Sequence, residues 1–148
     1  MPALPLGREW IAARLPHKGS MCLLDTLLAC DEDSIRCSAA THRAADNPLR
    51  AHGRLGAACA IEYAAQAIAL HGAVQGAASA PGMLAAVRDV TLHVATLEQL
   101  PAPLDIECQR LAGDARTLLY RFAVSCAGQA VATGRATVVI GLPGASGT

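Results

Sequence analysis

The sequence predicts an α+β fold in which an antiparallel sheet wraps one long apolar helix. Glu62 is the only formal charge between Leu55 and Val74, a run composed mainly of Ala, Ile, Leu and Gly. A helix formed by that run is apolar on nearly every side, so other parts of the protein have to cover it. Segments with strand periodicity group before and after the run instead of alternating with further helices, which excludes a Rossmann-type winding.

The segments before the long helix are recognised by their periodicity and their turn residues. The apolar run 21–30 lies between Gly19-Ser20 and an acidic triplet, as is typical of a buried strand, and the chain then returns as its hairpin partner. Asn47-Pro48 marks the polar stretch that follows as a loop. We therefore expect a short helix at residues 8–14 with Trp10 as its packing anchor, strands at 21–30 and 34–41, and a loop at 42–54.

The long helix is expected at about residues 56–75, because Gly76 and Pro81-Gly82 end it. After it, apolar side chains alternate with polar ones from Leu104 onward, the pattern of a half-buried strand. Tight hairpin turns are required between the later strands, at Gly113-Asp114 and at Ala127-Gly128. The four strands expected here cover residues 83–97, 104–109, 117–124 and 131–140.

Composition limits the classes of protein and of partner. The 148 residues suffice for a single domain with its own core at about residues 10–140, followed by a flexible Gly/Pro/Ser-rich tail at 141–148. Zero formal net charge argues against a nucleic-acid-binding protein that relies on positive charge. Apolar residues reach 53% while aromatic residues make up 3%, so small side chains fill the core and leave room for a ligand.

Cysteine spacing and the N-terminal sequence bear on cofactors and location. The six cysteines include no C-x-x-C pair, which fits buried thiols in a reducing compartment and no metal site; we expect no cofactor. The N-terminus has no signal-peptide pattern. The apolar run approaches the length of a membrane span, but Glu62, Gln66 and His71 interrupt it. A cytoplasmic protein without a membrane span is expected.

Three motifs together resemble one family of proteins. They are Leu15-Pro16-His17 followed by Met21-Cys22-Leu23-Leu24-Asp25, the helix motif Glu62-Tyr63-Ala64-Ala65-Gln66-Ala67, and Val131-Ala132-Thr133-Gly134-Arg135-Ala136 in the last strand. They resemble the β-hydroxyacyl-acyl-carrier-protein dehydratases over about residues 10–140. The Glu-Tyr-x-Ala-Gln form of the helix motif, preceded by Gly53-Arg54, is most similar to the dehydratase-like proteins of aryl-polyene and related fatty-acid-like pathways.

The resemblance implies a hot-dog fold, an obligate dimer, and a catalytic His and Glu that come from different protomers. It also shows a departure. Typical dehydratases carry the catalytic His in a His-Phe-Pro-Gly loop, whereas this chain reads His52-Gly53-Arg54-Leu55, with His52 closer to Glu62 than the family spacing. Two alternatives follow: a shortened loop in which His52 still reaches the site, or loss of the catalytic His.

Dehydration of a 3-hydroxyacyl thioester requires a base for the C2 proton and an acid for the departing C3 hydroxyl. Imidazole suits the first task, which makes His52 the candidate base. A carboxyl group desolvated in an apolar helix suits the second, and Glu62 is expected to be such a buried acid. Backbone N–H groups at the helix start, from Gly56 through Ala57 to Ala58, are candidates for holding the charge that develops on the thioester oxygen.

Other polar residues have open alternatives. Gln66, one turn after Glu62, either holds that carboxyl, binds the amide region of the substrate, or satisfies a buried neighbour. Arg43, Arg50 and Arg54 either dock an acidic acyl carrier protein or form an ordinary solvated loop. Glu62 itself could be a carboxylate satisfied by neighbours without a chemical role, and His52 could be idle in solvent. Structural roles are expected for His17 and Tyr63, and His42, His71 and His93 are expected to be surface or core histidines.

Three functions remain open. The leading hypothesis is dehydration of a (3R)-hydroxyacyl thioester on an acyl carrier protein. A second is thioester hydrolysis, since hot-dog thioesterases also use a carboxylate of the helix. The third is a non-catalytic or half-catalytic partner in a heterodimer, which the missing Phe-Pro-Gly sequence favours. In each case the expected partner is a second hot-dog subunit, identical or different, and neither nucleic acid nor a membrane is expected.

Overall fold

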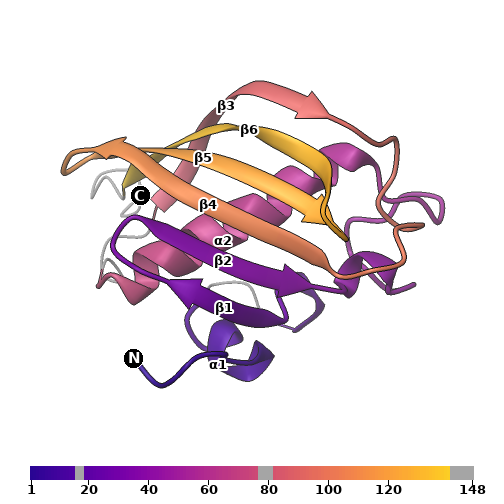
Figure 1. Cartoon of the computed structure of the whole chain (residues 1–148), viewed down its shortest axis with the longest axis horizontal. Coiled ribbons are helices and arrows are strands. Elements are labelled where there is room, and N and C mark those ends of the chain that lie inside the picture. Colours follow the sequence, from indigo (N-terminus) through magenta and orange to yellow (C-terminus); the bar gives the residue numbers. More distant parts are fainter. Residues whose placement is uncertain (16–18, 77–81, 141–148) are drawn as a thin grey trace, which may run out of the picture.

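A computed structural model describes residues 1–15, 19–76 and 82–140 of the chain, and it shows one long helix held in a six-stranded antiparallel sheet (Figure 1). The strands lie in the order β1-β2-β4-β5-β6-β3. The helix α2 crosses behind the central strands in Figure 1 and contacts every strand from β2 to β6. The elements are α1 (Arg8–Ala12), β1 (Thr26–Cys30), β2 (Ser34–Ala39), α2 (Ala60–Val74), β3 (Gly82–Leu92), β4 (Leu104–Gly113), β5 (Thr117–Cys126) and β6 (Gln129–Ile140), with single 3-10 turns at Gly19–Met21, Thr41–Arg43 and Ala57–Cys59.

The α+β architecture expected from the sequence is confirmed, and the two tight turns lie where they were predicted. Ala127 and Gly128 both have positive φ, 50° and 79°, as a two-residue hairpin with the twist of the sheet requires. The other turn follows Gly113, where the Asp114 carboxylate accepts from the amides of Arg116 and Thr117. The predicted tail at 141–148 and the Pro81 helix-ending signal lie outside the described residues.

Three predicted strands are too long. The strand expected at 34–41 ends at Ala39, and the other two are shortened because tertiary contacts use their backbone groups. The run 21–30 becomes a strand only at Thr26; before that, the Leu23 amide and the Met21 carbonyl bond the Gln66 side chain instead of a strand. The predicted strand 83–97 ends at Leu92. Its last residues cross the start of the helix, where Ala95 O accepts from Ala57 N (3.0 Å).

The core is built from small aliphatic side chains around a few large ones. Tyr63 on α2 and Tyr120 and Phe122 on β5 are its largest fully buried side chains. The segment Ala57–Val74 is long and apolar enough to cross a membrane by length and composition alone. Half of that segment is buried inside the fold, as in the core helix of a globular protein.

The ring of Phe122 fills the space into which a Cβ atom at residue 134 would project, so it fits only beside a glycine. Gly134 lies opposite Phe122 in the β5–β6 pairing, and a Cβ atom at Gly134 would lie 2.7 Å from Cζ of the Phe122 ring and 3.2 Å from Cγ2 of Val90. Phe122 is buried, so its ring cannot swing into solvent to make room. The family-like sequence Thr133-Gly134-Arg135 therefore has a packing reason in this chain.

We expect Gly134→Ala to lower the free energy of unfolding by about 1–3 kcal/mol, the usual cost of overfilling a packed core. Urea denaturation measures the change. The matched control is Gly7→Ala, because a Cβ there meets nothing within 4 Å and the φ of −86° suits any residue. The control should stay within about 0.5 kcal/mol of the unsubstituted protein; equal effects at the two sites would contradict the packing explanation.

The C-terminal end of α2 is bonded to the β1–β2 turn and to β5 through buried His71. Its Nε2 lies 2.8 Å from the Asp31 carbonyl oxygen and its Nδ1 lies 2.5 Å from Oη of Tyr120. Because a carbonyl oxygen only accepts, Nε2 carries the proton and Nδ1 accepts from the tyrosine hydroxyl. Burial lowers the pKa of His71 below its ordinary value of 6.5. His71 is thus a core histidine, one of the two alternatives expected for it.

We expect the free energy of unfolding to fall as the pH drops below about 6.5, because the unfolded chain then binds a proton at His71 that the folded chain does not. Above that pH both states carry the neutral imidazole, so this residue adds no pH dependence. Urea denaturation from roughly pH 5 to 8 measures the effect. His71→Gln should show a shallower loss on acidification than the unsubstituted protein, and an identical loss would contradict the assignment.

Candidate functional site

One side of α2 is left uncovered by the sheet, and Glu62 lies on it. Residues 58, 62, 65, 69 and 72 fall on a single helical stripe by their spacing, and the side chains of Ala58, Glu62 and Ala69 are exposed. We call these five residues the α2 stripe. All its members except Glu62 are Ala or Gly. The stripe is therefore a smooth apolar surface that carries one carboxylate.

The inner face of β3 extends this uncovered surface. Leu84, Val87 and Leu92 pair with buried residues of β6, so all three side chains point to the side of the sheet on which α2 lies. Val90 shares that face, since its Cγ2 approaches the inner side of Gly134. These four side chains are nevertheless 36–44% exposed. β3 is also an edge strand, paired with β6 alone.

The expected burial of Glu62 is wrong for the single chain. Its side chain is exposed, and among the described residues it has no hydrogen bond or ion pair. The physical reason is geometric: an antiparallel sheet curves around one side of a helix, and the sequence cannot show which side is left open. Any desolvation of Glu62 has to come from something that covers the α2 stripe.

His52 lies at the tip of a two-residue turn. Ala51 and Arg54 pair through both backbone hydrogen bonds, 2.8 and 3.0 Å, and the two residues between them have positive φ, 54° for His52 and 75° for Gly53. A left-handed conformation is strained for histidine, whereas glycine adopts it freely. The His52 side chain is exposed, and within one chain no described contact joins it to Glu62.

The predicted oxyanion donors at the helix start are only partly available. The Ala57 amide donates to Ala95 O at 3.0 Å, so it is not a free donor, and the prediction that it holds the thioester oxygen is wrong. The amides of Gly56 and Ala58 have no acceptor among the described residues, and both residues are exposed. They lie at the start of the single 3-10 turn that leads into α2, where unpaired N–H groups point away from the helix.

Sequence reasoning missed Glu98, which fixes the chain just before the helix. Its Oε1 accepts from the Leu55 amide at 2.7 Å. That bond, helped by the Thr96 hydroxyl and the positive charge of Arg50, holds the pKa of the Glu98 carboxyl below its usual range. No local signal marks Glu98, because its partner lies far away in the sequence and the segment before it was interpreted as strand.

Gln66 plays the third of the roles that the sequence left open, because its side chain bonds buried neighbours. Its Oε1 accepts from the Leu23 amide at 2.9 Å, and its Nε2 donates to the Met21 carbonyl at 2.6 Å. The side chain is buried, and it bonds neither Glu62 nor an open surface. Gln66 therefore holds the segment before β1 against α2, and its predicted substrate-binding role finds no support in these contacts.

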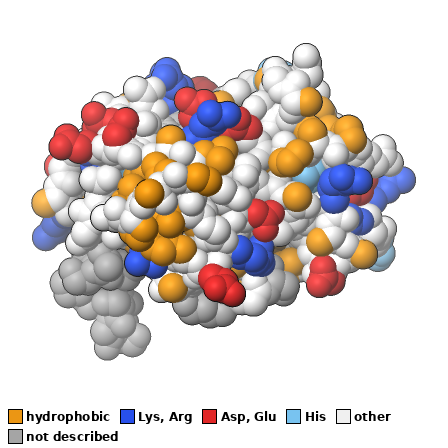
Figure 2. Space-filling model, turned by 60° about the horizontal axis from the view of Figure 1, so that its bottom comes forward, with side chains coloured by type: hydrophobic (Ala, Val, Ile, Leu, Met, Phe, Trp, Pro, Cys, Tyr) orange, Lys and Arg blue, Asp and Glu red, His pale blue; other side chains and the backbone are white. Residues whose placement is uncertain are grey.

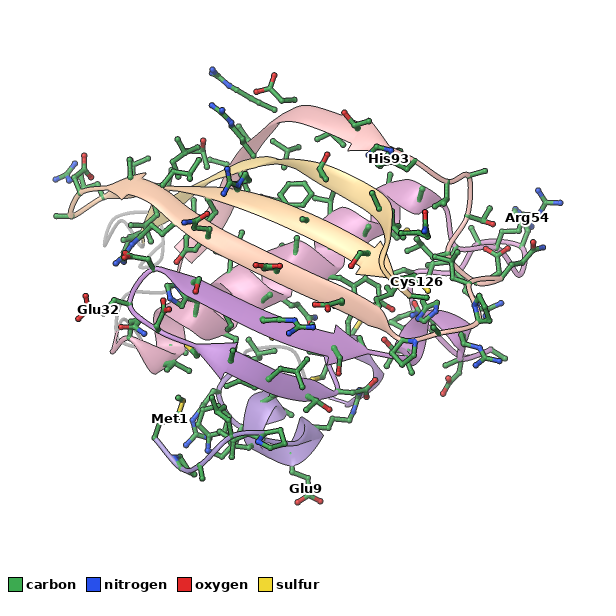
Figure 3. All side chains as sticks on the ribbon, in the orientation of Figure 1. Met1, Glu9, Glu32, Arg54, His93 and Cys126 are labelled. Carbon is green, nitrogen blue, oxygen red and sulfur yellow. The ribbon has the colours of Figure 1, made fainter. Side chains whose placement is uncertain are left out.

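Two further buried side chains order the loop before the helix. Oη of Tyr63 lies 2.8 Å from Oγ1 of Thr41 and accepts from Nδ2 of Asn47 at 3.1 Å, and burial raises the pKa of the phenol. His42 is fully buried, with Nε2 3.0 Å from the Leu100 carbonyl, and burial lowers its pKa. His93 is exposed just beyond β3 (Figure 3), and His17 lies outside the described residues.

The three arginines of the loop differ in their freedom. Arg43 donates to Pro101 O, and Arg50 donates to Gly53 O and His42 O. The exposed Arg54 projects outward from the loop (Figure 3). On the face shown in Figure 2, basic side chains lie at the end of the molecule that carries this loop and also at several other places. Of the three, Arg54 has a guanidinium group that forms no hydrogen bond or ion pair with any described residue.

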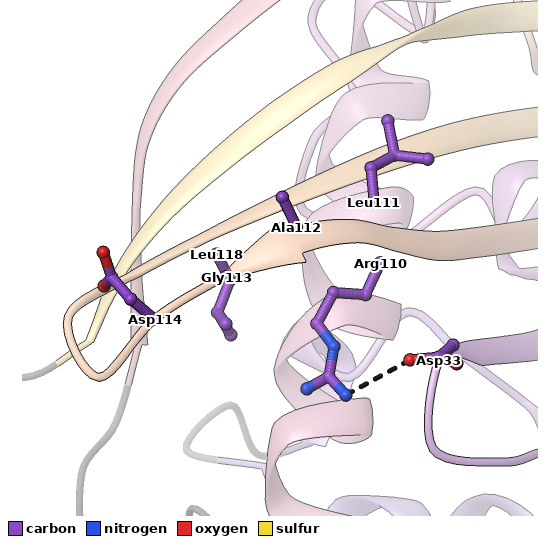
Figure 4. Close-up of a pocket in the computed structure, with 7 residues that line it drawn as sticks. All are labelled: Asp33, Arg110, Leu111, Ala112, Gly113, Asp114 and Leu118. Atoms are coloured by element: carbon purple, nitrogen blue, oxygen red, sulfur yellow. Dashed lines mark hydrogen bonds and ion pairs between the residues drawn. The ribbon is translucent and has the colours of Figure 1, made fainter.

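A pocket of about 360 Å³ lies elsewhere, at the β4–β5 hairpin (Figure 4). Asp33, Arg110, Asp114 and Leu118 are among its lining residues, and Arg110 is ion-paired with Asp33 at 3.3 Å. The pocket adjoins the β1–β2 turn that the C-terminal end of α2 contacts, whereas Glu62 is in the first turn of that helix. It therefore belongs to a different part of the molecule, and the described residues include no cluster that could hold a metal ion.

The sequence comparison shows the family. Residues 10–141 match the ApeP-like family, described as ApeP dehydratase, so the chain belongs to this dehydratase family. This confirms the resemblance found in the motifs. A comparison with curated proteins gives no match.

Solved structures confirm the hot-dog fold. The dehydratase heterocomplex ApeI:P from Xenorhabdus doucetiae matches at 26% identity and a TM-score of 0.79, over 95% of this chain and 93% of that one. A mutant thioesterase from Pseudomonas aeruginosa matches at 15% identity and 0.66, over 91% and 94%. A thioesterase-like protein from Silicibacter sp. TM1040 matches at 13% and 0.60, over 78% of each chain. The two latter similarities show the fold alone.

The contacts of Gln66 predict its effect on stability. Gln66→Ala leaves the Leu23 amide and the Met21 carbonyl without their partner, and each unsatisfied group costs about 1–3 kcal/mol of the free energy of unfolding. Urea denaturation measures the loss. Gln75→Ala is the control, because the bond of Gln75 to Asp31 O is exposed to water and its removal should cost about 1 kcal/mol or less. Equal losses at both sites would show that Gln66 does not hold the segment.

Proposed function

We propose that this protein dehydrates a (3R)-hydroxyacyl thioester carried on an acyl carrier protein to the trans-2-enoyl thioester, within a pair of hot-dog subunits. The pathway is a fatty-acid-like or aryl-polyene-like biosynthesis. The observation that carries the proposal is Glu62: it is the glutamate of the family-like helix motif, and it is the one charge on an otherwise apolar, uncovered surface. Membership of the ApeP-like dehydratase family supports the type of reaction.

The reaction is an elimination with two proton transfers. The base removes the C2 proton, the C2–C3 double bond forms, and the C3–O bond breaks as Glu62 protonates the hydroxyl, which leaves as water. His52 is the proposed base. The amides of Gly56 and Ala58 are the proposed donors to the thioester oxygen, since at the helix start these amides find no acceptor within residues 1–15, 19–76 and 82–140.

A second subunit over the α2 stripe completes this proposal. Covering the stripe and the inner face of β3 removes apolar side chains from water, and it also desolvates Glu62. A carboxyl group in an apolar site that excludes water is suited to act as a proton donor. The similarity to the ApeI:P heterocomplex supports a different hot-dog chain as the partner. A second copy of this chain is the alternative.

A half-catalytic or non-catalytic partner role is the second candidate. Two observations favour it: the missing Phe-Pro-Gly sequence, and the heteromeric nature of the similar ApeI:P assembly. In that case this chain contributes Glu62 or an acyl-binding surface, and the other subunit supplies the base. Thioester hydrolysis stays as an outcome of the test.

The proposed carrier protein docks at the loop end of the molecule. Carrier proteins that present an acidic surface are attracted by exposed guanidinium groups, which raise the association rate more than the affinity. Arg54, together with Arg43 from the same loop, is the proposed contact. The six cysteines are free thiols, which suits the proposed cytoplasmic location.

We expect Glu62→Gln to reduce turnover at least about a hundredfold, because a carboxamide keeps the shape of the side chain but cannot donate the proton. His52→Ala should cause a loss of similar order. The measurement is intact-mass spectrometry of a 3-hydroxyacyl carrier protein incubated with the chain alone and with its hot-dog partner. Loss of one water from the carrier-bound acyl group reports dehydration.

Glu107→Gln is the control, since Glu107 is exposed on β4 and should leave turnover unchanged. Full turnover by a folded Glu62→Gln protein would refute the acid role. Dehydration that appears with the partner and is insensitive to His52→Ala indicates the half-catalytic candidate. Release of free acid from the carrier protein indicates a thioesterase.

A further inference from the structure

Arg50 binds together the segments that precede α2. Its Nη1 donates to Gly53 O at 2.9 Å, and its Nη2 lies 3.4 Å from His42 O. Its charge also acts on the Glu98 carboxyl, which accepts from the Leu55 amide at 2.7 Å. Arg50 thus bonds the backbone just before Arg54, at Gly53, and Glu98 bonds it just after Arg54, at Leu55. Gly53 directly follows His52.

The environment of Arg50 differs from that of a docking residue. The guanidinium makes its bonds within the chain, and its Nε is buried without a partner among the described residues. Nδ1 of the neighbouring His42 is likewise buried and unpartnered. Burying a charged group with incomplete hydrogen bonding lowers stability, so packing alone does not explain an arginine at this position.

The turn that Arg50 contacts needs support. His52 is a non-glycine residue with φ of 54°, a conformation that persists when the surrounding structure holds it. The turn is exposed, and beyond the Ala51–Arg54 pair the Arg50–Gly53 bond is the side-chain contact that fixes it. Across the helix start, Leu97 N donates to Leu55 O at 2.8 Å, which anchors the chain directly after the turn.

We propose that Arg50 is a positioning residue that holds the His52-Gly53 turn in the orientation needed for proton abstraction, and that it does not dock the carrier protein. The inference rests on the proposed function, in which His52 is the base. Arg50 acts through His52 and touches neither substrate nor reacting atoms. Arg54, which is exposed two residues beyond His52, remains the docking residue.

Steady-state kinetics on two substrates separate positioning from docking. One substrate is a 3-hydroxyacyl carrier protein, and the other is the same acyl group on pantetheine, which has no protein surface to dock. In the complete two-subunit assembly, Arg50→Met should lower kcat about tenfold to a hundredfold on both substrates. Its KM for the carrier-bound substrate should stay unchanged. Arg54→Gln should instead raise KM on the carrier-bound substrate alone.

A double substitution tests whether Arg50 acts through His52. Adding Arg50→Met to His52→Ala should produce no further loss of kcat, because the residue that Arg50 positions is already absent. Arg50→Lys, which keeps the charge but not the planar fork, provides a second variant if Arg50→Met folds poorly. A purely structural role predicts additive losses, and additive losses would overturn the proposal.

Amide hydrogen exchange supplies a readout that does not depend on activity. Arg50→Met should accelerate exchange at Arg54 and Leu55 tenfold or more, while the amides of α2 keep their protection. Unchanged exchange together with a raised carrier KM would overturn the proposal and make Arg50 a docking residue. Accelerated exchange in an assembly that never dehydrates its substrate would refute the proposed function, and with it the role of Arg50 in proton abstraction, while the contact with the turn stands.

Discussion

The apolar helix α2 needs cover on every side, and the curved sheet supplies cover on one. Strands β2 to β6 contact its inner side, where Ala64 and Ala67 are buried. The other side carries Ala, Gly and the exposed Glu62. Because exposed apolar surface is costly in water, this unequal cover is the constraint on which the edge strand β3, the α2 stripe and the proposed second subunit all depend.

The start of α2 shows how the fold fixes a site without regular secondary structure. The Ala95–Leu97 segment crosses the helix start with two backbone bonds, and the Glu98 carboxylate holds the Leu55 amide. These contacts order a stretch in which the amides of Gly56 and Ala58 have no acceptor in the described part of the chain. A loop held on both sides presents donors that need no reorganisation during a reaction, which is the usual basis of electrostatic stabilisation.

The contacts that stabilise the fold and the groups proposed to react lie at different ends of α2. At the C-terminal end, buried His71 is satisfied by Asp31 O and Oη of Tyr120, and both contacts are structural. At the N-terminal end, Glu62 has no partner among the residues that the structure describes, and His52 has a strained backbone. Such a division is common in enzymes, because reactive groups have to keep free hydrogen-bonding capacity that structural groups use up.

The sequence by itself determined the α+β class, the long helix, the turns at Asp114 and Ala127-Gly128, and the family, since periodicity, turn residues and motifs are local. Only the tertiary structure decided where the strands end. The Gln66 side chain bonds the backbone of Met21 and Leu23, and the Ala57 amide at the helix start bonds Ala95 O. It also decided that Glu62 is exposed and that Arg50 binds backbone. Those outcomes depend on which groups meet across long sequence separations, and no local pattern encodes which side of a helix a sheet leaves open.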